Sequence, residues 1–243
     1  SATRYQQYNF RTNITAKVNN YINTNIGILA RREERHFPTE SAGSIFRMLM
    51  RGRPTEPEVW PNGKPGPDIE NGQNPYVITT NATGYQKNPT DYLQANGSVD
   101  ITNPWVKGLK LTLSGAIDKT TSTNKTWQTP WTLYSWDKIT YEADNVTPLL
   151  VGNIRSNFKD PRLTQSYSSV LNTNLTGMLS YDRKFGVGHT IGVLAGVTKE
   201  EFKGEGFLAF RRNYISPAID QLFAGGSLQQ NTDGGGYSRA RLG

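Results

Sequence analysis

Six segments of the chain alternate apolar and polar residues with a period of two, the pattern of a β-strand with one apolar and one polar face. In the first segment Tyr8, Phe10 and Ile14 share one face, and polar side chains occupy most of the positions between them. The segments with this pattern are 8–19, 23–31, 93–102, 109–118, 171–181 and 191–197. Three apolar residues fall on the polar faces: Leu29, Met178 and Leu194. We therefore predict an all-β, antiparallel protein, with a seventh strand beginning in 237–242.

The connections between these segments are alternately short and long. Turns of a few residues follow the first, third and fifth strands, whereas the long connections cover about 36–91, 122–165 and 204–237. In an up-and-down barrel, successive connections fall at opposite ends, and outer-membrane barrels place short turns inside and long loops outside. A soluble sandwich also has one apolar face per strand, but nothing in it requires loop lengths to alternate. The pattern therefore favours a transmembrane β-barrel with long extracellular loops.

Strand length and the rings near the short turns agree with a barrel. The strands are about as long as the 9 to 11 residues that a tilted spanning strand needs. Tyr21, Trp105 and Phe185 lie in the short turns, where aromatic rings suit the lipid headgroup level, although simple turn packing explains each of them equally well. Natural barrels begin at about eight strands, so we expect 1–243 to be a partial barrel domain completed by strands elsewhere.

Composition and charge narrow the functional classes. Hydrophobic residues make up 35% of the 243 residues, which is low for a large buried core, and 24 glycines favour strands joined by turns. The absence of cysteine excludes disulfides, thiolate metal sites and a cysteine nucleophile. No run approaches the roughly 18 apolar residues of a spanning helix, so any membrane crossing must use strands. The net charge is +7, but only Arg31, Arg32 and Arg35 crowd together, and no nucleic-acid partner is predicted.

The sequence shows no apparatus for catalysis, and we predict that the protein is not an enzyme. His36 and His189 are isolated, and no Gly-x-Ser-x-Gly or His-Glu-x-x-His pattern accompanies them. The acidic pairs 33–34 and 200–201 are interpreted as solvated charge at strand ends; calcium in an outer loop is compatible with acidic pairs, but no cofactor or metal is predicted. Gly234–Gly236 has no following Lys-Ser or Lys-Thr, so we interpret it as a flexible loop tip and not a phosphate site.

Aromatic residues in the second long connection form the best candidate binding site. They fall within fifteen positions: Trp127, Trp131, Tyr134, Trp136 and Tyr141. Rings of this type stack on sugar faces or fill partner interfaces, so we predict substrate or partner binding here. The alternative is that they pack the loop against itself or against its neighbours.

Several short motifs follow one another along the chain. Ser44–Pro57 (SIFRMLMRGRPTEP) starts as a short helix whose Ile45, Met48 and Leu49 are expected to be buried under the loop. The other motifs are Trp60-Pro-Asn-Gly63, Gln73-Asn-Pro75, the PWVKGLKL segment 104–111, the NYIS segment 213–216 and the Ala-Gly pair 224–225. In this order and spacing they resemble the SusC/RagA-like family of TonB-dependent outer-membrane transporters, over nearly the whole chain.

The resemblance implies a barrel of about 22 strands with a plugged lumen, to which this chain contributes about six or seven. It also implies location in the bacterial outer membrane, a SusD-like surface lipoprotein as partner, and TonB-driven uptake of oligosaccharides or peptides. The plug domain and the segment that contacts TonB have no counterpart in these residues. Two alternatives remain open: a soluble β-rich carbohydrate-binding module that uses the same aromatic cluster, and a surface adhesin without transport.

Overall fold

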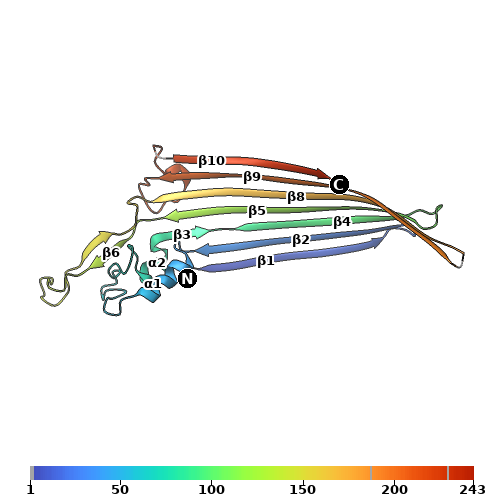
Figure 1. Cartoon of the computed structure of the whole chain (residues 1–243). Coiled ribbons are helices and arrows are strands. Elements are labelled where there is room, and N and C mark those ends of the chain that lie inside the picture. Colours follow the sequence, from blue (N-terminus) through green and yellow to red (C-terminus); the bar gives the residue numbers. More distant parts are fainter. Residues whose placement is uncertain (1–2, 187, 229) are drawn as a thin grey trace.

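The computed structural model describes residues 3–186, 188–228 and 230–243. Within these residues, one eight-stranded antiparallel sheet dominates, and a separate two-stranded sheet lies beyond one of its ends (Figure 1). The strands of the large sheet are β1 (Arg4–Lys17), β2 (Ile22–Phe37), β3 (Gly84–Lys87), β4 (Thr90–Thr102), β5 (Leu109–Gln128), β8 (Arg162–Phe185), β9 (His189–Arg212) and β10 (Gln230–Leu242). The remaining elements are β6 (Thr132–Ser135) and β7 (Val151–Ile154) of the small sheet, α1 (Ala42–Arg51), α2 (Pro75–Ile78), and the 3-10 turns η1 (Asn81–Thr83) and η2 (Leu222–Ala224).

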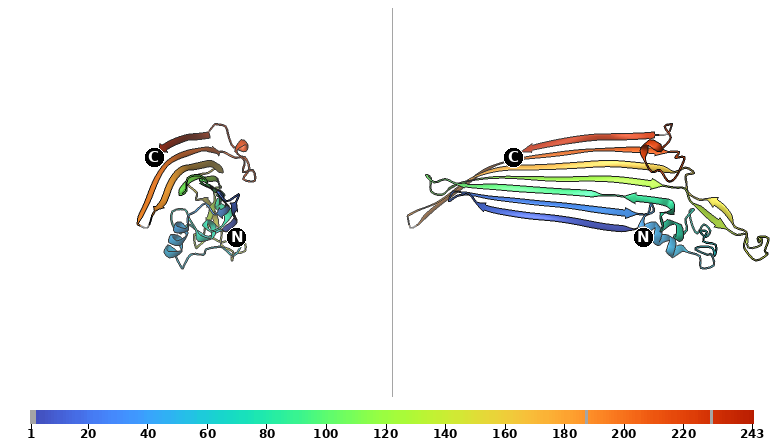
Figure 2. Two further views of the ribbon diagram at one scale, coloured as in Figure 1. Left: turned by 90° about the vertical axis from the view of Figure 1, so that its right-hand side faces the viewer. Right: turned by 180° about the vertical axis from the view of Figure 1, so that it is seen from behind.

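The large sheet is an up-and-down meander, because its strands pair in the order in which the chain forms them. The position between β2 and β5 is occupied by two strands, β3 and β4, which follow one another along the same line. Pro89 lies between these two strands and has no N–H to donate, which accounts for the interruption. Short turns gather at one end of the sheet and long connections at the other, and the sheet is curved when seen end-on (Figure 1; Figure 2). The predicted antiparallel up-and-down architecture is confirmed.

The long connections are shorter than predicted, because the strands continue beyond the apolar alternation. The second connection is 129–161 instead of about 122–165. The third is 213–229 instead of about 204–237. The first, predicted at about 36–91, contains the strand β3. The outer part of β5 is polar on both faces, so the contrast between faces vanishes there while the backbone ladder continues.

The glycine triplet Gly234–Gly236 belongs to β10, so its interpretation as a flexible loop tip is wrong. The triplet pairs with residues 205–207 of β9. A Cβ at Gly234 would lie 3.2 Å from Phe207 Cβ, which is tighter than ordinary contact. Small residues therefore let β10 lie close beside Phe207, whose ring stacks on Tyr167 of β8 at 5.6 Å. Because glycine has no side chain, the sequence pattern could not reveal this part of the strand.

The predicted short helix is present as α1. Ser41 caps it, since the Ser41 hydroxyl accepts a hydrogen bond of 3.1 Å from the backbone N–H of Ser44. Met48 is buried and Ile45 is half-buried, as expected. Leu49 is 58% exposed, contrary to the expectation. It lies about 100° around the helix axis from Met48, and the connection covers only the Met48 side.

Buried apolar residues lie at the end of the molecule that carries the long connections. Three clusters form there: Val77, Trp131, Leu133 and Phe158; Met48, Ile69 and Ile78; and Trp127, Leu163 and Tyr214. The large sheet itself is a single layer (Figure 2). Most of its side chains on both faces are therefore exposed or half-buried. No helix among the described residues has the length and apolar character needed to cross a membrane.

The two faces of the large sheet differ sharply in chemistry. Residues directly opposite in an antiparallel ladder project to the same side, so the register connects each face from β1 to β10. One face carries exposed apolar side chains, which we call the apolar band: Phe10, Ile14, Ile26, Ile28, Leu93, Leu113, Ile117, Leu175, Leu179, Val193 and Val197. The opposite side, called the polar face, carries mainly amides, hydroxyls and charged groups: Asn9, Asn13, Asn25, Gln94, Asn96, Asp118, Asn172 and Asn174.

Candidate functional site

The polar face holds a line of three charged residues on β2. Glu33 is only 5% exposed, and its carboxylate lies between two arginines. Arg35 Nη2 donates to Glu33 Oε2 at 2.6 Å, and Arg31 Nε forms an ion pair with Glu33 Oε1 at 3.3 Å, without hydrogen-bond geometry. Residues two apart on a strand share a face, so the sequence Arg-x-Glu-x-Arg places the three side chains in line. Glu33 is therefore not solvated charge, which corrects the interpretation of this acidic pair; Glu34 is on the other face and half exposed.

Tyrosines flank the two arginines. The Arg31 guanidinium lies 4.1 Å from the ring centroid of Tyr92 on β4, and that of Arg35 lies 5.8 Å from the ring of Tyr5 on β1. Contacts of this kind between guanidinium and ring faces hold an arginine in place while leaving donors free. The register produces them, because Tyr5 lies opposite Arg35 and Tyr92 lies opposite Arg31.

A chain of hydrogen bonds runs beside the charged line on β1. The Tyr5 hydroxyl donates to Gln7 Oε1 at 2.7 Å, and Gln7 Nε2 donates to Asn9 Oδ1 at 3.0 Å. Gln7 lies opposite Glu33, and Asn9 lies opposite Arg31. The polar face thus presents two parallel rows of donors and acceptors, one neutral and one with a net positive charge.

Amide side chains continue the polar face toward the short turns. Gly27 on β2 leaves room for these amides, because a Cβ at this position would lie 2.6 Å from Asn96 Oδ1 and 3.0 Å from Asn13 Oδ1. Farther along, Thr15 donates to Asn25 Oδ1 at 2.9 Å, again between neighbouring strands. Such a surface can exchange hydrogen bonds with a polar ligand or with water along its whole length. The described residues contain no group of three His, Cys, Asp or Glu side chains that could hold a metal ion.

The structure places the five predicted aromatic residues in three separate environments. Trp127 is at the end of β5, 4% exposed, with its ring edge-on to Tyr214 at 4.7 Å. Burial raises the pKa of the Tyr214 hydroxyl above its ordinary value. Tyr214 comes from the third connection, which is also tied to the sheet by Asp220, a partner of both Tyr85 and Lys125. Trp127 therefore packs the third connection onto the sheet.

Trp131 is also an interior residue. It is 9% exposed and meets Phe158 edge-on at 6.0 Å. Its indole N–H donates to the carbonyl of Gly72 at 2.9 Å. The packing alternative thus describes Trp127 and Trp131, and both are too enclosed to offer a ring face to a ligand in this conformation.

Tyr134, Trp136 and Tyr141 are more accessible. Tyr134 on β6 is half-buried, with the Lys64 ammonium 4.9 Å from its ring centroid. Trp136 and Tyr141 meet edge-on at 5.2 Å in the projecting tip beyond the small sheet, and Trp136 donates its indole N–H to the carbonyl of Thr140. Ile139 and Val146 in the same tip are 80% and 75% exposed. Substrate or partner binding by these three rings stays a prediction.

The sequence analysis did not identify the charged row of β2 or the tyrosines that flank its arginines. The available signal was Arg-x-Glu-x-Arg at 31–35, whose spacing of two aligns the charges because β2 continues past the predicted segment 23–31. Their tyrosine neighbours could not be recognised, because they come from β1 and β4 and only the register brings them together.

Comparison with known proteins bears on the fold. No protein-family model matches the sequence, and no curated protein does. Among solved structures, a chain of the RagAB peptide transporter aligns with 99% of this chain at a TM-score of 0.66 and 13% identity. The RagAB peptide importer in its "closed-closed" and "open-open" states aligns equally well, at 14% identity. The chain has the fold of part of a transporter β-barrel.

The match covers only a part of the transporter chains. This chain spans 26% of the length of each of these transporter chains. At such low identity the likeness concerns the fold alone. These structural neighbours are transporters and not enzymes.

Proposed function

We propose that the chain forms part of the barrel wall of an outer-membrane TonB-dependent transporter, which imports oligosaccharides or peptides together with a SusD-like surface lipoprotein. The observation that carries this proposal is the height of the apolar band. On the apolar side it covers 10–18 at β1, 22–30 in β2, 93–101 in β4 and 109–117 in β5, nine positions in each case. A strand that crosses a bilayer needs about 9 to 11 residues.

The band reaches less far toward the long connections in β9 than in the strands before it, since Leu171 of β8 is still level with Ala30 of β2. Its last apolar residue before the charged zone is Ala30 in β2 and Val197 in β9. Through the register, Val197 is level with Thr24, six positions from Ala30 (30 minus 24). A lipid layer accounts for apolar side chains such as Phe10 and Leu175 that remain 60% and 61% exposed.

In this proposal the polar face lines the interior of the barrel. The row Arg31, Glu33 and Arg35 has a net positive charge and guanidinium groups that can bind carboxylates in a forked geometry. The matched structures are described as peptide transporters, and a peptide carries a terminal carboxylate and a hydrogen-bonding backbone. Peptides are therefore the substrate class that these side chains fit best.

The long connections would face outward and meet the lipoprotein. α1 presents Phe46, Leu49 and Met50, which are 67%, 58% and 87% exposed. Exposed apolar side chains grouped on a short helix suit a protein interface. TonB would act on the plug of the whole transporter.

Membrane extraction tests the proposal against a soluble carbohydrate-binding module. Bacterial membranes would be washed with alkaline carbonate and then with detergent, and the transporter that contains this chain would be followed by immunoblotting. We expect it only in the detergent fraction, because the side chains of the apolar band are exposed among the residues that the structure describes. Release by carbonate would contradict the barrel and favour the module.

Uptake separates a transporter from an adhesin. Cells carrying Arg31→Gln with Arg35→Gln should import a labelled acidic peptide several-fold more slowly than wild-type cells. The substitutions remove the two guanidinium groups that would bind the carboxylates of the peptide. Arg32→Gln is the matched control, since its side chain projects to the opposite side of β2. Absence of import by wild-type cells that bear the lipoprotein and TonB would refute the transport proposal.

A further inference from the structure

We propose a binding groove for an anionic lipid headgroup on the outer surface of the sheet, which is the side that carries the apolar band. The groove lies at the upper edge of the band, meaning the edge nearer the long connections. The inference rests on the proposed barrel, since it requires that the apolar band lies in a bilayer. The groove crosses β1, β2, β4 and β5 and has a volume of about 390 Å³. Its occupant would be a lipid whose phosphate headgroup carries a net negative charge and whose acyl chain descends along the band.

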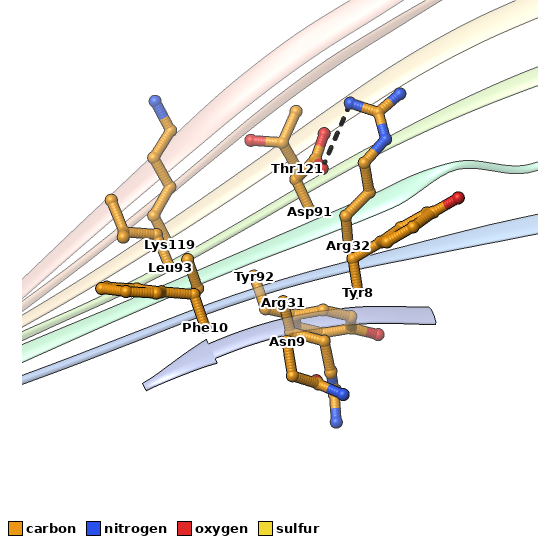
Figure 3. Close-up of a pocket in the computed structure, with 11 residues that line it drawn as sticks. Tyr8, Asn9, Phe10, Arg31, Arg32, Asp91, Tyr92, Leu93, Lys119 and Thr121 are labelled. Carbon is orange, nitrogen blue, oxygen red and sulfur yellow. Dashed lines mark ion pairs between the residues drawn. The ribbon is translucent and has the colours of Figure 1, made fainter. Parts of the chain in front are cut away.

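The groove has an apolar lower part and a charged upper part. Phe10, Ala30 and Leu93 lie side by side in one row of the register and form the lower part. The next row toward the long connections brings Tyr8, Arg32, Asp91 and Thr121 together. Figure 3 shows Lys119, Asp91 and Arg32 projecting to one side of the ribbon, and Arg31 and Asn9 to the other. Asn9, Arg31 and Tyr92 also line the hollow, but by register they belong to the polar face, whereas Lys119, Arg32 and Asp91 belong to the outer surface.

Lys119 is the residue whose ammonium group would bind the anionic headgroup. It lies between two apolar neighbours in its row, opposite Leu93 on one side and Leu171 on the other. Among the residues that the structure describes, no carboxylate lies within ion-pair distance of its ammonium group. Arg32, by contrast, is 2.9 Å from Glu34 and 3.6 Å from Asp91. A lysine at the edge of hydrocarbon extends its stem along the apolar surface and places its ammonium at headgroup level.

Charge and shape together favour a lipid over a free ion. Lys119 and Arg32 supply two positive charges, and Arg32 is paired with the carboxylates of Glu34 and Asp91, so Lys119 is the cation of the groove that an anionic headgroup would neutralise. Tyr8 is 56% exposed beside Arg32, at the level where tyrosines occur in membrane barrels. Cations continue on the same outer surface farther from the band, with Arg4, Lys87 and Lys125 lining neighbouring hollows. An inorganic anion would use the cations alone and leave Phe10 and Leu93 uncovered.

Lipid binding by the intact transporter tests the groove. The full-length transporter would be purified in neutral detergent and titrated with phosphatidylglycerol, or with phosphatidylcholine of the same acyl chains, and the bound lipid counted by native mass spectrometry. We expect tighter binding of phosphatidylglycerol. Lys119→Gln should weaken it about fivefold, since one cation near a headgroup layer contributes about that factor, and should leave phosphatidylcholine unchanged. Lys119→Arg should retain the preference.

Three controls keep the outcome decisive. Arg11→Gln removes the same charge from the polar face, and its lipid binding should equal that of wild type. Unchanged phosphatidylglycerol affinity in Lys119→Gln, or equal affinity for the two lipids, would overturn the groove. Displacement of the lipid by millimolar inorganic phosphate would assign the site to a free anion and overturn it too. Release from membranes by carbonate would refute the barrel itself, whereas failure of lipid selectivity in a detergent-requiring protein would refute only the groove.

Discussion

The indole N–H of Trp131 donates a hydrogen bond of 2.9 Å to the carbonyl of Gly72, and this contact joins the second long connection to the first. The same stretch carries Tyr134, whose carbonyl accepts a hydrogen bond of 2.9 Å from the Trp60 indole. The two connections are thus held together by two indole hydrogen bonds, one donated by each connection to the other. The loop end of the molecule therefore behaves as one packed unit, with a core of its own.

Removing the Trp131 contact should loosen both connections. Trp131→Phe keeps a ring against Phe158 but leaves the Gly72 carbonyl without its partner, at a cost of about 1 to 3 kcal/mol. Trp131→Ala should cost more, about 3 to 5 kcal/mol, because a cavity is added. Hydrogen exchange of the peptides covering 66–78 and 129–158 would measure the loss of protection. Trp105→Ala, at a turn where the ring is 87% exposed, should change nothing there; equal effects at both sites would contradict the assignment.

Gly84 should tolerate no side chain. Its φ is +106° and ψ −156°, a conformation nearly restricted to glycine, and a Cβ would overlap the carbonyl oxygen of Trp127. Gly84→Ala should therefore cost about 1 to 3 kcal/mol or displace β3 from β5. Gly97→Ala is the control, since its Cβ would come no closer than 3.6 Å to a neighbouring atom. The folded fraction on heat-shift gels would report both, and similar loss in the control would count against the steric explanation.

A charge on the apolar band should be far more harmful than the same charge one residue away. Leu113 lies at the centre of the band in β5, and Ser114 projects to the polar face. Leu113→Arg should lower the free energy of unfolding by about 2 to 4 kcal/mol in a bilayer, whereas Ser114→Arg should cost little. Urea titration of the full-length barrel in lipid vesicles would compare them. Equal destabilisation would mean that both sides of β5 meet the same environment.

The projecting tip should lose order in acid. The pKa values of Asp137 and Asp144 lie below their ordinary value of 3.8, first because of the hydroxyls of Thr140 and Thr147 and then because of backbone N–H groups. A depressed carboxyl pKa stabilises the turn above 3.8, and this contribution disappears as the pH falls through the folded-state pKa. Hydrogen exchange of 136–148, corrected for intrinsic rates, should show protection lost only below about pH 4.

Substitution at the tip gives an independent check. Asp137→Asn keeps an acceptor oxygen for the N–H groups of Ile139 and Thr140 and should retain protection with less dependence on pH. Asp137→Ala should lose protection at neutral pH. A turn that stays protected in the alanine variant would show that the carboxylate does not hold it.

Much of the wall could be predicted without coordinates, because side-chain direction along a strand is a local property. The contrast between Phe10 and Arg11, or between Leu113 and Ser114, already separates the two faces. Even the exceptions were placed correctly: Leu29 lies on the polar face, opposite Arg11 and Gln94. The alternation of short and long connections likewise indicated which turns share an end.

The local pattern failed where both faces are polar or the side chain is absent. The outer ends of β5, β8 and β9 and the triplet Gly234–Gly236 belong to strands, yet no apolar contrast marks them. Backbone hydrogen bonds to a neighbouring strand hold these segments extended, and such partners are not encoded within the segment. The loop lengths were overestimated for this reason.

The sequence by itself determined the class of structure: strands, their order, and one apolar and one polar side to each, since these follow from the spacing of residues along the chain. Only the tertiary structure decided which residues meet. It buried Glu33 between two arginines, enclosed Trp127 and Trp131, and placed Lys119 between Leu93 and Leu171 at the edge of the apolar band. Each of these outcomes depends on the register between strands or on the packing of connections distant in sequence, and neither is a property of any single segment.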